Sequence, residues 1–354
     1  MPKQVRLLIL GTGGMANTHA RAFAAIPGVV LAAGVDTRAD VLAAFCDRHG
    51  IGRRFTSVDA ALAWGRFDAV ANVTPDAAHF PTTMPLMAAR RHVLCEKPLA
   101  TNHADALAMA AAAAGAGVVN MVNLSYRNVP ALQAAARMVA EGAIGKVRHF
   151  EASYLQSWLT QPAWGDWRTQ HQWLWRLSTA HGSKGVLGDI GIHILDYATF
   201  IAGADPAEVS CRLTTFDKAE GGRIGDYVLD ANDSFTMHLA LTNGALGTVS
   251  ATRFATGHLN DLRLRLYGDK GGLEVLFEKG ESSLNACLGA NIATGTWAEV
   301  PTPEVPTIYR RFIDAIQGTG DGQPDFARGA ALQQVLDLAE ASARAGCRSL
   351  PVAE

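Results

Sequence analysis

The stretch Val5-Arg6-Leu7-Leu8-Ile9-Leu10-Gly11-Thr12-Gly13-Gly14-Met15-Ala16 decides how the first part of this chain folds. Its first six residues are apolar except for one arginine, and they predict a buried strand that ends at Gly11. Residues 11–16 fit the pattern G-x-G-x-x-A, and a helix is expected over residues 16–25. In this context the first glycine permits a tight turn, the second lets the backbone approach a diphosphate, and the small Ala16 lets the helix pack closely on the strand. The stretch therefore predicts a dinucleotide-binding loop, whose candidate cofactor-binding residues are Gly11, Thr12, Gly13, Gly14 and Met15.

An acidic residue follows at the end of the next expected strand, Val29–Val35. Asp36 lies 25 residues after Gly11 (36 − 11 = 25), where a carboxylate can bind both ribose hydroxyls of an adenosine. Thr37 and Arg38 complete the candidate group at this strand end. Asp36 repels a 2′-phosphate and so favours NAD, whereas Arg38 could stack on adenine or bind that phosphate, which keeps NADP open. A structural turn with a capping aspartate is the alternative, but strand, glycines, helix and acid together favour dinucleotide binding.

The first third of the chain repeats this alternation of short apolar runs and amphipathic stretches, which is typical of βαβ units around a parallel sheet. Further strands are expected at residues 68–73, 92–95 and 118–122, and helices over residues 38–49 and 101–114. The last of these helices is so rich in alanine that propensity alone favours it.

The pattern changes after about Ser125. A helix is expected over residues 130–141, and strands at residues 147–154, 209–215, 234–241, 245–253, 262–267 and 273–277. Asn243-Gly244 lies between two of these runs and predicts a hairpin, and helices over 308–317 and 327–345 close the chain. The sequence therefore predicts an α/β Rossmann domain (residues 1–124) and an α+β domain (residues 125–354). The second domain has a large, mainly antiparallel open sheet, and its C-terminal helices pack back toward the first domain.

Two clusters carry groups that could do chemistry. Glu96-Lys97-Pro98 follows the strand at residues 92–95, at the sheet edge where ligands bind in open α/β sheets. Asp189 and His193 are four residues apart, so on a helix both would project from one face. Taken singly, each residue has a simpler explanation. Lys97 could be a solvated loop residue, His193 a core residue, and Asp189 a helix cap. A metal site formed with Asp196 fits the spacing but has no fourth ligand, so none is expected.

Taken together, these segments resemble the glucose–fructose oxidoreductase / inositol 2-dehydrogenase (Gfo/Idh/MocA) family. The resemblance covers essentially the whole chain, and the segments that carry it are Gly11–Ala16, Thr74-Pro75-Asp76 with His79, Glu96-Lys97-Pro98, Trp175-Arg176, and Gly188-Asp189-Ile190-Gly191-Ile192-His193. It implies that Lys97 transfers a proton at the substrate hydroxyl and that Asp189 and His193 complete a catalytic triad. It also implies cofactor-binding roles for six residues, with the first three lining the nicotinamide half of the cleft: Thr74, Pro75, His79, Glu96, Lys97 and Arg176.

The chemistry of an alcohol dehydrogenase is consistent with these residues. Oxidation of an alcohol by NAD⁺ requires a base for the hydroxyl proton, and a partly desolvated lysine beside a cationic nicotinamide is easier to deprotonate. His193 is the competing base, with Asp189 orienting it. Loss of the proton acceptor should lower the rate roughly 10²–10⁴-fold.

Five of the seven tryptophans lie between residues 154 and 177. If residues 151–158 are extended, Tyr154, Gln156 and Trp158 share one face, which suits a ring with polar edges and an apolar face, such as a sugar or cyclitol. The pattern is similar to that of family members acting on inositols and anhydro-sugars. These three residues, with Lys97, Asp189 and His193, are the candidate substrate-binding set. Packing at a core or subunit interface is an equally good explanation of the tryptophans.

Composition limits the remaining function classes. The 354 residues carry 31 Lys+Arg and 33 Asp+Glu, a formal charge of −2, which argues against a nucleic-acid or anionic-membrane partner. The five cysteines are scattered, and the N-terminus has no signal-peptide pattern, so a cytoplasmic protein with reduced thiols is expected. Together with the motifs, the family resemblance implies a homodimeric or homotetrameric NAD(P)-dependent dehydrogenase of a secondary hydroxyl in a sugar, anhydro-sugar or inositol. The alternatives are a cofactor-retaining aldose oxidoreductase, an NAD-dependent glycosidase, and a non-catalytic dinucleotide sensor.

Overall fold

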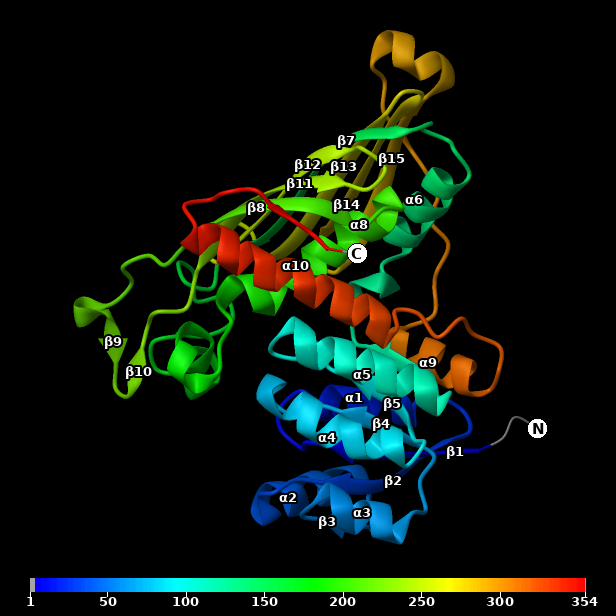
Figure 1. The fold of residues 1–354 in the computed structure, drawn as a ribbon, viewed down its shortest axis with the longest axis vertical. Helices are drawn as coiled ribbons and strands as arrows, with labels where there is room; N and C mark the ends of the chain where they lie inside the picture. Colours follow the sequence, from blue (N-terminus) through cyan, green and yellow to red (C-terminus); the bar gives the residue numbers. More distant parts are fainter. Residues whose placement is uncertain (1–3, 354) are drawn as a thin grey trace. The chain divides into compact units, whose positions relative to one another are not determined.

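The structure is a computed structural model that describes residues 4–353, and it contains two compact units (Figure 1). The first comprises the chain up to Ser125 together with Pro306–Gln333, and the second comprises Tyr126–Val305 together with the residues from Gln334 onward. Across residues 4–353, no helix has both the length and the apolar composition needed to span a lipid bilayer.

The first unit is built on a six-stranded sheet in which every pair of neighbours is parallel. The strand order is β3-β2-β1-β4-β5-β6. The strands are β1 (Val5–Leu10), β2 (Val29–Val35), β3 (Arg54–Phe55), β4 (Ala69–Asn72), β5 (His92–Cys95) and β6 (Asn120–Val122). The order reverses between β1 and β4, which is the switch point where doubly wound sheets bind ligands. The predicted parallel sheet is confirmed.

Helices connect these strands as βαβ crossovers require. They are α1 (Ala16–Ala24), α2 (Ala39–His49), α3 (Val58–Trp64), α4 (Asp76–Ala88) and α5 (His103–Ala116), joined from the end of the chain by α9 (Ile308–Ile316). The periodicity did not predict α3 or α4. Pro81 and Pro85 lie inside α4 and argue against a helix in the sequence.

The core of the first unit contains β1, whose residues are buried except for Arg6. Helix α9 packs on α1, where Tyr309 and Phe312 meet Phe23 edge to face at ring-centroid distances of 5.1 and 6.2 Å. A segment some 300 residues distant along the chain thus completes the core around the dinucleotide-binding motif.

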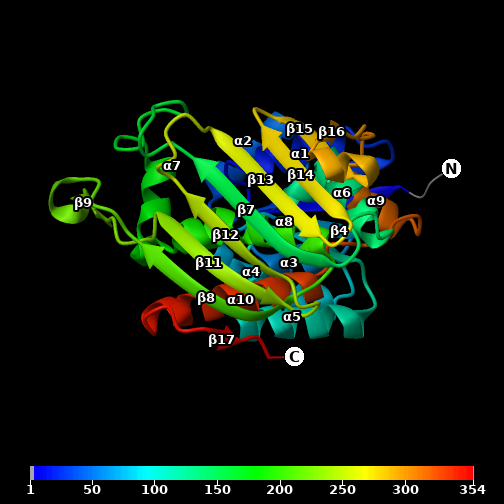
Figure 2. The same cartoon turned by 90° about the horizontal axis from the view of Figure 1, so that it is seen from above.

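The second unit is built on a nine-stranded sheet, seen face-on in Figure 2. Its strands in spatial order are β16 (Ala298–Glu299), β15 (Glu281–Leu288), β14 (Gly271–Glu278), β13 (Asn260–Gly268), β7 (Val147–Gln156), β12 (Leu246–Thr252), β11 (Ser234–Leu241), β8 (Pro206–Thr214) and β17 (Leu350–Pro351). All neighbours are antiparallel except β7 and β12. The predicted, mainly antiparallel sheet is therefore confirmed, and the sequence missed β15, β16 and β17.

Local chemistry explains the hairpin between β11 and β12. Gly244 has φ +83°, a left-handed conformation that glycine adopts without steric cost. Its N–H donates to the carbonyl of Leu241 at 2.8 Å, and the side chain of Asn243 accepts from the N–H of Ala245 at 3.0 Å. The Asn243-Gly244 turn is thus formed as predicted.

One face of this sheet is covered by helices α6 (Pro130–Ala140) and α8 (Ile192–Ala202), which pack on each other (Figure 2). Helix α8 is buried almost throughout, and it contacts β7, β12 and β13. The long helix α10 (Phe326–Arg344) begins among the residues of the first unit and ends among those of the second.

The tryptophan-rich segment forms a small second core. Trp158, Leu159, Trp167, Leu174 and Leu177 are buried there together with Leu229. Trp173 lies against both Trp158 and Trp164, with ring centroids 5.4 and 6.1 Å apart. Packing therefore accounts for several of these tryptophans.

Candidate active site

The glycine-rich loop forms an open cradle at the N-terminus of α1. Gly11 has φ +82°, and a Cβ there would lie 2.7 Å from the carbonyl oxygen of Val73, so only glycine fits. A Cβ at Gly13 or Gly14 would meet no atom within 4 Å. Ala16, the first residue of α1, is fully buried. An open space beside the first N–H groups of a helix suits a diphosphate.

Asp36 follows β2 and is held by donors from two sides. Its Oδ2 accepts from the N–H and the hydroxyl of Thr12 at 2.9 and 3.0 Å, and its Oδ1 accepts from the N–H and Nε of Arg38 at 3.0 and 3.2 Å. Burial raises the pKa of Asp36, but the hydrogen bonds from Arg38 and Thr12 outweigh it and hold the pKa at about 2. The carboxylate is therefore ionised at neutral pH and is linked directly to the glycine-rich loop. Arg38 is mostly exposed, and Thr37 at the same strand end is exposed as well.

Asn72, at the end of β4, positions the next loop. Its amide group donates to the hydroxyls of Thr82 and Thr83 at 2.9 and 3.0 Å. Its Oδ1 accepts from the N–H and hydroxyl of Thr74 at 3.2 and 2.7 Å. Thr74 is thus fixed at the carboxyl edge of the sheet, and Pro75 precedes α4 as its N-cap residue.

His79 is buried inside the first unit. The side chain is fully buried, and its two ring nitrogens lie 2.8 Å from the carbonyl oxygen of Pro98 and 2.9 Å from that of Thr74. The ring therefore ties the loop after β4 to the Lys97-Pro98 segment. Both polar atoms of the ring face the protein backbone, and the role of His79 in lining the nicotinamide half of the cleft stays a prediction.

Glu96 and Lys97 follow β5, the neighbour of β4. Glu96 Oε1 lies 2.7 Å from Nε2 of His19 and accepts from the Asn123 amide at 2.6 Å, and its Oε2 accepts from the N–H of Lys97 at 3.2 Å. Burial raises the pKa of Glu96, but His19, Lys97 and Asn123 together lower it to about 2. Glu96 thus anchors the backbone that carries Lys97, and Lys97 itself is half-buried.

In the second unit, Asp189 lies in a π-helical turn, Leu187–Gly191, that leads into α8. The continuous α-helix assumed for the Asp189–His193 spacing is therefore corrected, because one extra residue is accommodated in this turn. Turns of this kind occur often at functional sites. Asp189 Oδ2 accepts from Nη2 of Arg253 at 2.9 Å and lies 3.7 Å from Nε of Arg176. Arg176 is thus beside Asp189, and its guanidinium lies over the ring of Trp175.

His193 is buried at the start of α8 and meets the ring of Tyr126 edge to face, with centroids 5.1 Å apart. Tyr126 begins a closed cycle of hydrogen bonds: its hydroxyl donates to that of Tyr154 at 2.5 Å, Tyr154 donates to Asn260 Oδ1 at 2.6 Å, and the Asn260 amide donates back to Tyr126 at 2.6 Å. Burial raises the pKa of Tyr126 and of Tyr154, so both hydroxyls stay protonated at neutral pH. The cycle fixes both rings beside α8.

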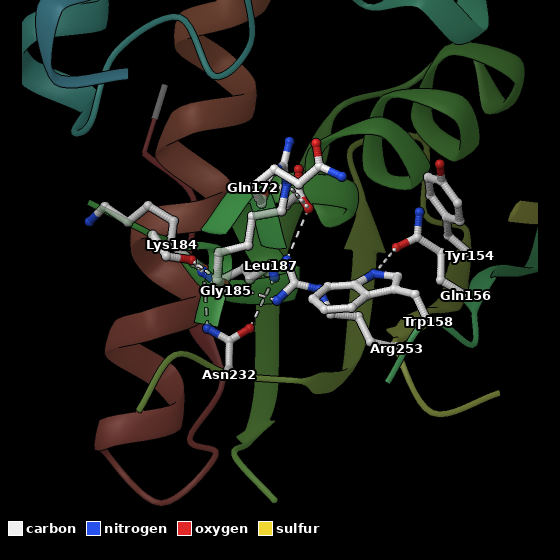
Figure 3. Close-up of polar contacts among 12 residues, drawn as sticks. Tyr154, Gln156, Trp158, Gln172, Lys184, Gly185, Leu187, Asn232 and Arg253 are labelled. Carbon is white, nitrogen blue, oxygen red and sulfur yellow. Dashed lines mark hydrogen bonds and ion pairs between the residues drawn. The ribbon is translucent and has the colours of Figure 1, made fainter. Parts of the chain in front are cut away.

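Gln156 and Trp158 extend this network (Figure 3). The Gln156 amide donates to Asn260 Oδ1 at 2.8 Å. The Trp158 indole N–H donates to Gln156 Oε1 at 3.1 Å. Tyr154 and Gln156 lie on the buried face of β7 as predicted, but the strand ends at Gln156, so Trp158 reaches the network from the loop beyond. All three residues are buried, and each already has a hydrogen-bond partner in the protein. They form a rigid wall.

Asp196 pairs with an arginine on the same unit. Its two oxygens accept from Nε and Nη2 of Arg127 at 2.6 and 2.8 Å, and both side chains are buried. Within residues 4–353, no group of three His, Cys, Asp or Glu side chains has the arrangement of a metal site. Asp196 therefore serves as one half of a buried ion pair.

The structure assigns Lys97 to the first unit, and Asp189 and His193 to the second. Sequence reasoning missed Asn72, Asn123, Asn260 and Arg253. Asn72 ends β4 and Asn123 follows β6 directly, so the same rule about carboxyl strand ends that identified Lys97 could have found them. Asn260 and Arg253 have no such signal, because only tertiary pairing brings them to Tyr154 and Asp189.

Comparison with known proteins shows similarity along nearly the whole chain. Residues 5–124 match a model described as an oxidoreductase family with an NAD-binding Rossmann fold, and residues 132–274 match a GFO/IDH/MocA C-terminal domain. An oxidoreductase domain protein from Kribbella flavida is 31% identical, with a TM-score of 0.84 over 99% of this chain and 100% of that one.

Two further comparisons concern a levoglucosan dehydrogenase. The protein of that name from Pseudarthrobacter phenanthrenivorans is 27% identical over 293 residues, which cover 77% of this chain and 73% of the relative. A levoglucosan dehydrogenase solved in complex with NADH and levoglucosan is 25% identical, with a TM-score of 0.85 over 99% of this chain and 100% of that one.

Proposed function

The chain belongs to the Gfo/Idh/MocA family of oxidoreductases with an NAD-binding Rossmann fold, and on this premise we propose that it oxidises a secondary hydroxyl of a sugar, anhydro-sugar or inositol. The observation that carries the proposal is the carboxyl edge of the first sheet, where the glycine-rich cradle, Asp36 and Lys97 follow β1, β2 and β5. This edge combines a dinucleotide site with a side chain that can accept a proton. The levoglucosan dehydrogenase complex with NADH supports this substrate class.

The residues of the cradle fit a dinucleotide. The open space at Gly13 and Gly14 leaves room for a diphosphate beside the N–H groups of residues 13–15, and the ionised Asp36 can accept hydrogen bonds from ribose hydroxyls. The same negative charge disfavours a 2′-phosphate, so the proposal is NAD, with NADP a weaker ligand. The exposed guanidinium of Arg38 would lie beside the adenine. When bound, the nicotinamide supplies the hydride acceptor.

Lys97 is the proposed proton acceptor. Its Nζ takes the proton of the secondary hydroxyl as the carbon is oxidised, and it returns that proton in the reverse direction. Two fixed elements hold its backbone: Glu96, which accepts from the Lys97 N–H, and His79, which contacts the carbonyl of Pro98. His193 is proposed to bind and polarise the reacting oxygen, and Asp189 is proposed to orient the substrate and His193.

The wall of Tyr154, Gln156 and Trp158 is proposed to face the substrate ring. Because the polar atoms of these side chains are bonded to each other and to Asn260, the wall presents shape and aromatic surface rather than new donors. Such a surface suits the apolar face of a pyranose or cyclitol. Arg176, whose Nη1 donates to the carbonyl of Gln172 at 2.6 Å, is proposed to contact the nicotinamide side of this site.

Three broader proposals accompany this one. Residues 1–124 would act as the cofactor domain and residues 125–354 as the substrate and oligomerisation domain. The face of the nine-stranded sheet opposite α6 and α8 carries exposed His149 and Glu151, and we propose that it joins copies of this chain into a homodimer or homotetramer. None of the five cysteines forms a disulfide, which supports a cytoplasmic location. The near-neutral formal charge of −2 supports the proposal that the protein has no nucleic-acid or membrane partner.

The test follows NADH formation by absorbance when the purified protein is given NAD⁺ or NADP⁺ with inositols, aldoses and anhydro-sugars. One polyol should reduce NAD⁺, and Lys97→Ala should lower that rate roughly 10²–10⁴-fold without abolishing NADH binding. Lys146→Ala is the matched control, because Lys146 is exposed on the second unit. If the protein bound the cofactor but no compound of the panel produced NADH, the proposal would be refuted. An NAD-dependent glycosidase or an aldose oxidoreductase that retains its cofactor would then be favoured.

A further inference from the structure

Arg253 is a fully buried cation that sequence motifs do not indicate. It follows β12 directly, and its side chain has no exposed surface. Its backbone is fixed on both sides: the N–H donates to the carbonyl of Asp233 at 3.0 Å, and the carbonyl accepts from the N–H of Leu159 at 3.4 Å. A side chain anchored in this way can hold a partner in one place.

The guanidinium of Arg253 joins three elements around the Asp189 turn. Nη2 donates to Asp189 Oδ2 at 2.9 Å, and Nη1 donates to the backbone carbonyl of Arg176 at 3.1 Å. The group lies over the ring of Trp158 at 4.9 Å (Figure 3). Burial lowers the pKa of Arg253, whereas the charges of Asp189 and Asp233 raise it. One planar cation thus links the carboxylate of Asp189, the backbone of Arg176 and the wall residue Trp158.

The turn that carries Asp189 is fixed by hydrogen bonds from Asn232, which lies next to the residue that bonds the backbone of Arg253. Asn232 accepts from the N–H of Leu187 at 3.0 Å through Oδ1, and it donates to the carbonyl of Lys184 at 3.2 Å through Nδ2 (Figure 3). Its carbonyl accepts from the N–H of Val186 at 2.8 Å. Since Asn232 precedes Asp233, which bonds the backbone of Arg253, one short segment aligns the turn with the guanidinium.

We propose that Arg253 is a positioning residue that holds the Asp189 carboxylate in its reactive orientation and couples it to the substrate wall through Trp158. A purely structural role would need no charge here, because a buried ion pair can be replaced by apolar side chains of similar volume without loss of stability. The two-pronged contact to a carboxylate and a backbone carbonyl requires the fork of an arginine, which a lysine cannot reproduce. The kinetic part of this proposal rests on the proposed function.

The first test is kinetic. Arg253→Ala should lower kcat about 10²-fold, the size expected when a reacting group moves by about 1 Å, with a smaller change in KM. Arg253→Lys should fold but retain the defect, and guanidinium ion added to Arg253→Ala should restore part of the rate. Arg344→Ala, which removes an exposed arginine from α10, should leave kcat unchanged. The proposal would be overturned if Arg253→Lys had the kcat of the wild type. It would also be overturned if Arg253→Ala lost stability but kept the kcat of the wild type.

The second test needs no substrate and so separates this proposal from the proposed function. In an Asp189→Asn background, replacing Arg253 should shift the thermal midpoint far less than in the wild type, because the two groups act as one unit. Equal shifts in both backgrounds would overturn the inference. Coupled shifts in a protein that oxidises no polyol would refute the dehydrogenase and leave the Arg253–Asp189 pairing in place.

Discussion

Replacing Gly11 with alanine tests whether the glycine-rich loop is fixed by backbone sterics. A side chain at φ +82° costs about 1–2 kcal/mol, and forcing a Cβ to within 2.7 Å of the Val73 carbonyl oxygen adds about 1–3 kcal/mol of overpacking. The contacted atoms belong to the backbone and cannot rotate away. We therefore expect Gly11→Ala to lose about 2–5 kcal/mol of stability, which for a unit of this size lowers Tm by roughly 4–20 °C.

Two further glycines make the experiment selective. Gly13→Ala has open space around its Cβ, so its Tm should stay near that of the wild type. Its methyl group would stand where a diphosphate approaches, so the Kd for NADH should rise by roughly tenfold or more, about 1.4 kcal/mol. Gly52→Ala, equally open and outside the loop, should change neither quantity.

Thermal unfolding by circular dichroism and NADH titration by fluorescence measure the two effects separately. The reasoning would be refuted if Gly11→Ala unfolded within about 2 °C of the wild type, since the steric cost would then be absent. It would also fail if Gly13→Ala bound NADH as tightly as the wild type.

Three other predictions follow from the buried charges. Asp36→Ala removes acceptors worth about 1.5–3 kcal/mol and should shift the ratio of NADH to NADPH affinity toward NADPH by roughly 10–100-fold; an unchanged ratio in titrations of both cofactors would contradict this role. The folded-state pKa of Glu96 is depressed to about 2, so the ionised carboxylate contributes about 3 kcal/mol to the free energy of unfolding. This contribution is present above about pH 4.5 and is lost as the pH falls toward 2. In urea unfolding across this range, the stability of Glu96→Gln should therefore depend less on pH than that of the wild type. Asp196→Ala leaves the buried Arg127 unpaired and should cost about 3–5 kcal/mol, whereas Asp196→Leu combined with Arg127→Met should cost much less; equal urea midpoints for the single and double variants would exclude a buried ion pair.

Local sequence determined five of the six strands of the first sheet and the glycine-rich loop, but not β3, α3 or α4. The predicted ranges of β1, β2 and β5 agree with the structure. Short apolar runs bounded by glycine or polar residues are typical of buried parallel strands. The glycine-rich loop and Asp36 were predictable for the same reason. Their roles follow from backbone conformation and from the strand end, and both of these are encoded within a few residues.

Helix α4 shows where local reasoning fails. Its two prolines oppose a helix in isolation, yet the residues between them include Thr82 and Thr83, which hold Asn72 in place. The packing of α4 on β5 and α5 outweighs the propensity. Helix α9 is a related case, since its sequence predicts a helix but only the fold places it on α1.

The sequence by itself therefore determined the dinucleotide cradle, the mainly antiparallel second sheet, and the residue types that could carry oxidoreductase chemistry. Only the tertiary structure decided which groups support them: the π-helical turn at Asp189, the buried Arg253 that contacts it, and the hydrogen-bond cycle of Tyr126, Tyr154 and Asn260. The physical reason is the distance along the chain over which each kind of interaction acts. Turn and strand preferences depend on neighbours within a few residues, whereas a buried charge or hydroxyl needs a partner, and burial lets that partner come from anywhere in the chain.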